Sequence, residues 1–440
     1  MEFCNEKIKG ELEKQLIGLR REFHKYPEEG WMEYKTTIDI VEYLKRLGLA
    51  VWYGKSIHSH RMGMPKDSII EKNKKAFIDE YKEYDCKKYD EVLDGYTGAV
   101  AVLDTKREGN TTVLRFDIDG LPIEESKCED HKPYIEGFAS KHQGYMHACG
   151  HDCHIAMGLT IAKYLCENVD KLAGKIIFIF QPAEEGVRGA YSLCNSKIVS
   201  DILKHCHYFL SSHIGFCAEN MEIGCSTTGF LGTEKMNVEF SGVSSHAGVA
   251  PEDGRNALMA ACALTSNVYN LTQNGKGISR ANVGKLISGS SRNTIPDKAE
   301  LEMEIRASKK IILDDLKEKV ENMIKGASLM YGVNYDKIVV GSADSFEYLN
   351  KDFTLKVEEV VKEMNLKPIY NCDFGASEDV TYFMNKVSES GGIASYFVIG
   401  TKRKFSHHSP KFDIDESNLI NGVMLYVNIL HSITNKKQAI

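Results

Sequence analysis

The sequence lacks any apolar run of the roughly 20 residues that a membrane-spanning helix requires, which argues against a helical membrane protein. Its first residues, MEFCNEKIKGELEKQ, form a charged helix pattern without the apolar core of a secretory signal peptide. No low-complexity tract interrupts the chain. These absences predict a soluble globular protein of the cytoplasm.

Basic residues are not in excess either. The chain has 55 Lys and Arg against 62 Asp and Glu, a formal net charge of −7. This balance argues against a nucleic-acid partner, because a protein that binds nucleic acid needs a basic surface. The 12 cysteines in 440 residues are few and irregularly spaced for a disulfide scaffold. We therefore expect reduced thiols, most of them small hydrophobic residues of the core.

A chain of this length is expected to fold as two domains. Helix patterns, among them residues 6–26 and 33–48, alternate with short β-rich runs. This alternation predicts an α/β fold with a mostly parallel sheet covered by helices on both faces. The expected strands are residues 98–103, 112–116, 175–180, 207–211 and 394–399.

The middle of the chain has a different pattern of predicted elements, with the order β-α-β-β-α-β of a ferredoxin-like module. Residues 299–307 alternate apolar and charged side chains, which is typical of a sheet with one face in water. The predicted strands are 236–242, 282–290, 299–307 and 334–341, and the predicted helices are 255–273 and 309–331. We therefore expect a module at 233–344 inserted into a domain made of residues 1–232 and 345–440.

Residues 54–97 fit neither domain, being charged and rich in tyrosine. Two interpretations are open. The segment is either a surface insertion with its own helix or a wall of the substrate site.

The first candidate for chemistry is the segment MHACGHDCH at 146–154. It contains three His, two Cys and one Asp just before a helix pattern at 155–165. A Cys-x-His pair projecting from a loop places sulfur and imidazole where both can bind a metal ion. The alternative is a redox-sensitive or merely buried cluster.

The second candidate is the adjacent pair Glu184 and Glu185, directly after the apolar strand 175–180. One carboxylate can bind metal while the other acts as a general base toward water. The alternative is a solvated acidic turn. His213 and His408 follow two further predicted strands, where lone histidines are most often surface residues.

The predicted sheet brings these groups together, because ligands of open α/β sheets bind at the carboxyl ends of the strands. Asp117 and Asp119 follow the strand 112–116 and add two carboxylates at the same edge. Independent surface residues would not align in this way. The sequence therefore predicts a metal site there.

These residues resemble those of the dinuclear metallohydrolases that include aminoacylases and glutamate carboxypeptidases, and within them the hippurate and indole-acetyl-amino-acid hydrolases. Further stretches resemble hydrolases of p-aminobenzoyl-glutamate, among them residues 61–63, 137–140 and 251–258. The stretches that carry the family resemblance are RFDIDGLP at 115–122, HACGHD at 147–152, QPAEEG at 181–186, SHAG at 245–248 and HSP at 408–410.

The resemblance implies a reaction and a set of site residues. It implies hydrolysis of the amide bond of N-acyl amino acids, with two divalent metal ions, Zn²⁺ or Mn²⁺, in each protomer. Cys149 would bridge the metals as a thiolate, Glu184 would be the general base, and Asp119 would orient a ligand. Asp117 stands where other branches have a histidine ligand. The implied ligands are Cys149, His151, Glu185, His213 and His408.

The inserted module resembles the family's lid and dimerisation domain. His246 is similar to a histidine that reaches a neighbouring active site and stabilises the oxyanion, and Asn293 and Arg306 are similar to residues that hold the substrate's carboxylate. Asn293 in a simple turn and Arg306 in water are the alternatives. The resemblance implies a homodimer formed through the lid, and the other option is a complex with a paralogous second subunit. A non-catalytic or partner-requiring subunit is the alternative function.

Overall fold

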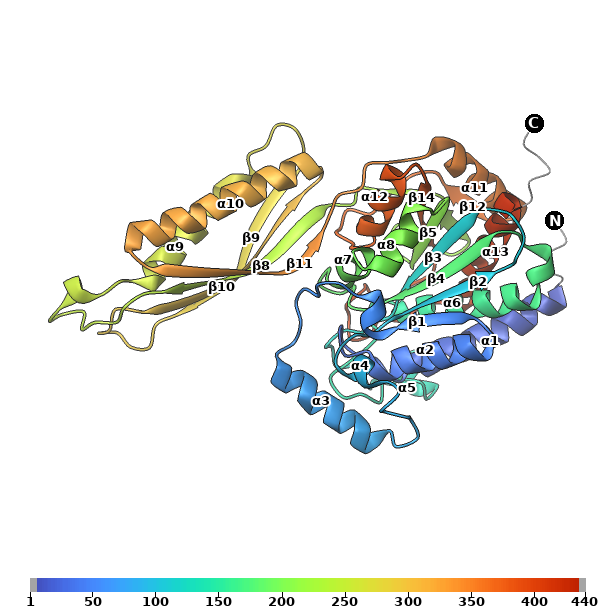
Figure 1. Ribbon diagram of the computed structural model, residues 1–440, viewed down its shortest axis with the longest axis horizontal. Helices are drawn as coiled ribbons and strands as arrows, with labels where there is room; N and C mark the ends of the chain where they lie inside the picture. Colours follow the sequence, from blue (N-terminus) through green and yellow to red (C-terminus); the bar gives the residue numbers. More distant parts are fainter. Residues whose placement is uncertain (1–5, 435–440) are drawn as a thin grey trace.

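An eight-stranded sheet forms the centre of the larger lobe in the computed structural model, which describes residues 6–434 (Figure 1). The strand order is β1-β2-β4-β3-β5-β14-β6-β12. The four central strands β4, β3, β5 and β14 run parallel to one another. The expected mostly parallel sheet is therefore confirmed. The strands are β1 (Ala50–Tyr53), β2 (Ala99–Asp104), β3 (Thr111–Asp117), β4 (Lys175–Gln181), β5 (Tyr208–Ile214), β6 (Glu222–Gly224), β12 (Lys367–Ile369) and β14 (Ile393–Ile399).

Helices cover both faces of this sheet because its strands are apolar on both faces. In β4, Ile176 and Phe178 belong to one buried core, whereas Ile177 and Ile179 belong to the core on the opposite face. The first face is covered by α1 (Glu6–His24), α2 (Tyr34–Arg46), α6 (His151–Glu167), α11 (Lys351–Glu363) and α13 (Leu419–Thr434), and the second by α7 (Gly189–Cys194), α8 (Lys197–Lys204) and α12 (Thr381–Glu389).

A second sheet lies in the smaller lobe on the left of Figure 1. Its antiparallel strands have the order β11-β8-β10-β9, and its elements follow the predicted order β-α-β-β-α-β. Met236 and Val238 of β8 pack under the helices, while Lys235 and Asn237 point to the other face. The elements are β8 (Gly232–Ser241), α9 (Ala257–Val268), β9 (Ser279–Ser288), β10 (Lys298–Ala307), α10 (Lys310–Tyr331) and β11 (Asn334–Ala343).

The segment 54–97 contains its own helix, α3 (Asp67–Glu80), as expected, together with η1 (Gly54–Ile57) and α4 (Asp90–Leu93). Its residues Gly63 and Met64 also line the cavity beside the candidate site described below. The segment is thus an insertion with its own helix, and its role as a wall of the substrate site stays a prediction. The remaining short elements are α5 (Lys132–Ile135), η2 (Val169–Lys171), β7 (Thr227–Thr228), η3 (Pro251–Asp253), η4 (Tyr269–Thr272), β13 (Cys372–Asp373) and η5 (Glu416–Asn418).

The expectation that all thiols are reduced is wrong at one pair, because Cys217 and Cys372 form a disulfide. The two residues are 155 positions apart in the chain, and no spacing rule in the sequence connects them. The other described cysteines carry free thiols, and most are buried or partly buried. Cys4 and the N-terminal pattern at 1–5 lie outside the described residues.

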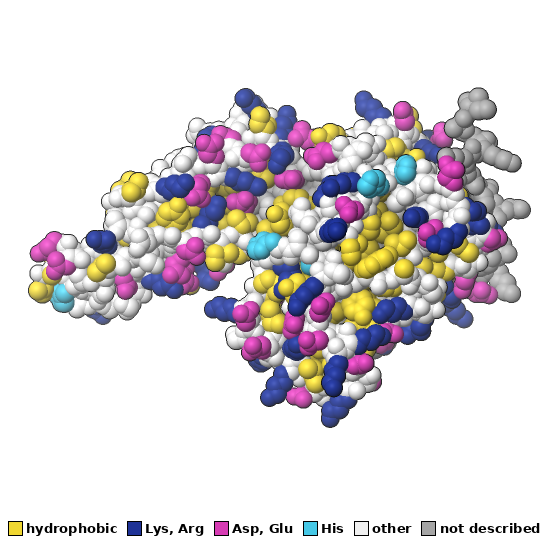
Figure 2. Space-filling model, in the orientation of Figure 1, with side chains coloured by type: hydrophobic (Ala, Val, Ile, Leu, Met, Phe, Trp, Pro, Cys, Tyr) yellow, Lys and Arg dark blue, Asp and Glu magenta, His cyan; other side chains and the backbone are white. Residues whose placement is uncertain are grey.

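Within residues 6–434, no helix is both long and apolar enough to cross a lipid bilayer. On the face drawn in Figure 2, basic and acidic side chains are interspersed over both lobes.

Candidate metal centre and active site

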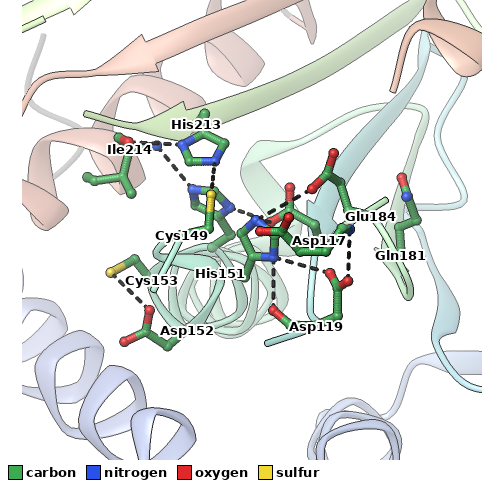
Figure 3. Close-up of polar contacts among 12 residues, drawn as sticks. Asp117, Asp119, Cys149, His151, Asp152, Cys153, Gln181, Glu184, His213 and Ile214 are labelled. Carbon is green, nitrogen blue, oxygen red and sulfur yellow. Dashed lines mark hydrogen bonds and ion pairs between the residues drawn. The ribbon is translucent and has the colours of Figure 1, made fainter. Parts of the chain in front are cut away.

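The predicted chemical groups meet at the carboxyl ends of the central strands (Figure 3). Cys149, Glu185 and His408 offer ligand atoms that lie within 4.8 Å of one another. The same is true of Cys149, His151 and His213, and of His151, Glu184 and Glu185. The five candidate ligands and the candidate base therefore form one continuous cluster, delivered by four separate segments of the chain.

His151 is the first residue of α6, which corrects the expected helix start at residue 155, while Cys149 lies in the turn just before the helix. The polar run HDCH lacks the apolar pattern by which a helix is predicted from sequence, because this first turn faces the site. Gly150 between them has φ +91°, and a Cβ there would come within 2.6 Å of Ile214 Cγ2. A glycine is thus needed for both side chains to face the same cluster.

His213 is the last residue but one of β5, not a residue beyond the strand as expected. Its Nε2 lies 3.5 Å from Cys149 Sγ. His408 lies in the loop after β14 with a left-handed backbone of φ +63°, and its Nε2 is 3.3 Å from Glu185 Oε1. A left-handed non-glycine residue is uncommon and concentrates at functional sites.

Hydrogen bonds fix which imidazole nitrogen faces the cluster. His151 Nδ1 donates to the backbone oxygen of Asp119 at 2.9 Å and lies 3.2 Å from Asp119 Oδ1. His213 Nδ1 donates to the oxygen of Ile214 at 2.9 Å. Both Nε2 atoms therefore direct a lone pair toward the cluster. Asp119 Oδ2 also accepts from the backbone N–H of Glu185 at 2.9 Å, so this carboxylate holds two candidate ligands.

The donor set fits divalent metal ions. His151 Nε2 is buried and has no hydrogen-bond partner among residues 6–434, a state that a bound cation relieves. Burial and the nearby Glu185 raise the pKa of the Cys149 thiol, and a metal ion is the group that stabilises a thiolate there. Imidazole, thiolate and carboxylate ligands suit Zn²⁺ and related ions.

Two residues that the sequence did not single out, Glu378 and Asp379, contribute to the electrostatics around Glu184. Burial, Glu378 and Glu185 raise the pKa of Glu184 well above its usual range. The Glu184, Glu378 and Asp379 oxygens lie within 4.8 Å of one another. Like charges at that spacing resist simultaneous ionisation, so Glu184 has the raised proton affinity that a general base needs.

A buried arginine balances these acids. Arg115 Nη2 donates to Glu378 Oε1 at 3.0 Å, Nη1 donates to Asp117 Oδ2 at 2.8 Å, and Nε donates to Gln181 Oε1 at 2.7 Å. The sequence signal was an arginine inside an apolar strand, since a buried guanidinium demands acidic partners. Which of 62 acids would pair with it required the fold.

Asp117 lies beside the cluster but is engaged elsewhere. Besides Arg115, it contacts Nδ1 of His154, whose Nε2 accepts from the backbone N–H of Ile214 at 3.0 Å. Arg115 and Asp117 thus support the ring of His154 behind the candidate ligands. Asp117 therefore supports the wall of the site.

The second residue of the HD pair, Asp152, points away from the cluster (Figure 3). It accepts from Arg20 Nε and from His24 Nδ1, both at 2.8 Å. All three side chains are fully buried. The contacts tie the first turn of α6 to α1, and the sequence had not identified Arg20 or His24.

The three candidate residues of the smaller lobe do not join this cluster. His246 and Asn293 are exposed. His246 follows the end of β8 and Asn293 follows the end of β9. The strand pairing places both ends farthest from Gly232, at the tip of the lobe (Figure 1). Arg306 lies at the near end, but its guanidinium donates to both oxygens of Glu304, at 2.9 and 3.0 Å.

Comparisons with known proteins identify the family of the chain. A model of peptidase family M20/M25/M40 matches residues 113–432. The chain is 40% identical over 429 residues to a p-aminobenzoyl-glutamate hydrolase subunit homolog of Haemophilus influenzae, covering 95% of this chain and 98% of that protein. It is 36% identical over 429 residues to the indole-3-acetyl-aspartic acid hydrolase of Enterobacter agglomerans, covering 95% of each. The solved aminobenzoyl-glutamate utilization protein of Klebsiella pneumoniae superposes with a TM-score of 0.79 at 28% identity, covering 97% of each chain.

Proposed function

Because this chain belongs to peptidase family M20/M25/M40 and is an amidohydrolase of N-acyl amino acids, we propose that its substrates are aryl-acyl derivatives of acidic amino acids. The two relatives above are named for p-aminobenzoyl-glutamate and indole-3-acetyl-aspartic acid, in which an aromatic acyl group is joined to glutamate or aspartate. The observation that carries the hydrolytic chemistry is the convergence of Cys149, Glu184, Glu185 and His408 at one sheet edge, and the names of the two relatives support the substrate class.

We propose that the cluster holds two divalent metal ions, Zn²⁺ or Mn²⁺. When bound, such ions supply Lewis acidity to the amide carbonyl and lower the pKa of water to about 7. Asp119 orients His151 and the backbone of Glu185 toward them. The proposed ligands are Cys149, His151, Glu185, His213 and His408.

Glu184 acts as the general base. Its carboxylate takes a proton from the attacking water and returns it to the leaving nitrogen, which a group with a raised pKa does well near neutral pH. Such a step contributes about 10²- to 10⁴-fold to the rate. Arg115 holds the neighbouring Glu378 in place through its 3.0 Å bond.

The smaller lobe completes the site of a second copy. We propose that residues 233–344 form a lid and dimerisation domain between the two parts of a catalytic domain, 1–232 and 345–440. His246 at the distal tip would stabilise the oxyanion in the neighbouring site, since one oxyanion donor contributes about 2.7–4 kcal/mol. Asn293 and Arg306 would hold the carboxylate beside the scissile amide, with Arg306 released from Glu304.

The direct test is hydrolysis by the purified chain alone, after addition of Zn²⁺ or Mn²⁺. A panel of p-aminobenzoyl-glutamate, indole-acetyl-aspartate, benzoyl-alanine and acetyl-glutamate separates the acyl group from the amino acid. We expect turnover of p-aminobenzoyl-glutamate and indole-acetyl-aspartate, and much slower turnover of benzoyl-alanine. Turnover of acetyl-glutamate alone would contradict the proposed acyl group.

The position of His246 favours a second possibility, namely a chain that needs another copy or a paralogous subunit for activity. The test mixes two inactive variants, Glu184→Gln and His246→Ala, under conditions of subunit exchange. A mixed dimer has one site with both defects and one intact site, so activity should reappear on mixing. If His246→Ala is fully active by itself, the shared site is wrong.

A further inference from the structure

We propose that Lys235 binds the side-chain carboxylate of the substrate and makes this enzyme selective for N-acylated glutamate or aspartate over neutral amino acids. The inference rests on the proposed function and adds a specificity residue to it. Its basis is the position of one uncommitted ammonium group in the cavity next to the catalytic cluster.

A cavity of about 480 Å³ opens beside Glu185, between the large lobe and the first strand of the smaller one. Its size is within the range of small-molecule sites, roughly 300–1,000 Å³. The large lobe contributes Glu29, Pro122, Glu185 and Arg188, among others. Lys235 of β8 projects from the facing sheet, on the face away from the helices.

The cavity has two basic residues in its lining, and only one is available to a ligand. Arg188 is committed to the protein, since Nε donates to the oxygen of Glu185 at 2.9 Å and Nη1 to the oxygen of Gly63 at 3.2 Å. Lys235 makes no hydrogen bond or ion pair within the described chain. Its cross-strand neighbour Glu304 is occupied by both guanidinium bonds of Arg306.

This arrangement favours an anionic ligand. Lys235 is half-buried, and burial lowers its pKa while the negative charges of Glu304 and Glu184 raise it. A cation that has lost part of its hydration and has no partner gains most when a carboxylate binds.

The chemistry of the substrate supplies the matching group. An N-acyl glutamate or aspartate has one carboxylate beside the scissile amide and a second on its side chain. The first is assigned to Asn293 and Arg306 under the proposed function. The second has no assigned partner, and Lys235 stands in the same cavity as Glu185 to receive it.

The test compares benzoyl-glutamate with benzoyl-glutamine, which has the same shape but no side-chain charge. Lys235→Met should lower kcat/KM for benzoyl-glutamate by about 10- to 100-fold, the range of one hydrogen bond to a charged group, and leave benzoyl-glutamine unchanged. Lys235→Arg keeps the charge and should keep most of the preference. Lys298→Met is the control, because it removes an exposed lysine of β10 that is paired with Glu239 of β8 and Glu300 of β10.

A binding measurement separates this inference from catalysis. In the Glu184→Gln background, calorimetric titration of the metal-loaded protein with benzoyl-glutamate should show a Kd that Lys235→Met raises by about the same 10- to 100-fold. An unchanged Kd, an equal loss for both substrates, or no binding of benzoyl-glutamate would overturn the role of Lys235. Absence of hydrolysis by the wild type with normal, Lys235-dependent binding would instead overturn the proposed function.

Discussion

The carboxylate of Asp119 gives the sharpest test of how the metal ligands are held. It contacts His151 Nδ1 at 3.2 Å through Oδ1 and accepts from the N–H of Glu185 at 2.9 Å through Oδ2. Asp119→Ala removes both contacts, while the backbone oxygen still accepts from His151 at 2.9 Å. Loss of a residue that orients metal ligands lowers metal affinity by about 10- to 100-fold, or roughly 1.4–2.7 kcal/mol.

Asp119→Asn should do less, because its amide keeps an acceptor oxygen and the backbone contact remains. We expect a loss at or below about 10-fold for this variant. The assay is competition for Zn²⁺ against a chromophoric chelator, with Asp315→Ala as the control, since Asp315 lies on α10 with its side chain paired to Lys319. Equal Zn²⁺ affinity in the wild type and Asp119→Ala would refute the proposed orienting role.

Buried charges lead to three further predictions. Glu184→Gln should lower kcat by about 10²- to 10⁴-fold while metal content, measured by mass spectrometry, stays at the wild-type level. Arg20→Met leaves three acidic partners without their fully buried guanidinium and should cost about 3–5 kcal/mol of stability. Its melting temperature should therefore be lower than that of the control Arg21→Met, because the Arg21 side chain is 30% exposed. Burial opposes protonation of His24, but Asp152 and Glu125 raise its pKa to about 9. The stabilisation from protonated His24 is therefore complete below about pH 6.5 and is lost as pH rises through 9, so the wild type should lose more melting temperature over that interval than His24→Gln.

Each of these has a result that contradicts it. Wild-type turnover by Glu184→Gln would remove the general base. Equal melting temperatures for Arg20→Met and Arg21→Met would mean that burial of the guanidinium does not matter. Parallel pH curves for the wild type and His24→Gln would show that His24 binds no extra proton in the folded state.

The parallel centre of the sheet and the β-α-β-β-α-β module could be predicted because their signals are local. Strand β4 is apolar on both faces, and β10 alternates charged and apolar residues, so burial alone sets their environment. The candidate ligands could be predicted because clusters such as 147–154 and 184–185 are short and chemically unusual. Their convergence followed from the rule for the carboxyl ends of parallel strands.

The partners of buried charges could not be predicted in the same way. Arg115 and Glu378 are 263 residues apart. Lys235 is a candidate ligand-binding residue only because the structure shows that Glu304 and Arg188 are bound to other groups. The start of α6 was missed because functional polar residues replace the apolar pattern in its first turn. The Cys217–Cys372 bond joins segments that only the fold brings together.

The proposed function depends above all on side chains from four segments binding metal ions at one edge of the sheet. Anomalous diffraction at the zinc edge, from crystals of the Zn²⁺-loaded protein, tests this binding most directly. We predict two peaks at bonding distance, about 2.0–2.3 Å, from Cys149, His151, Glu185, His213 and His408, with Cys149 shared between them. Peaks elsewhere in the protein, or none at this cluster, would contradict it.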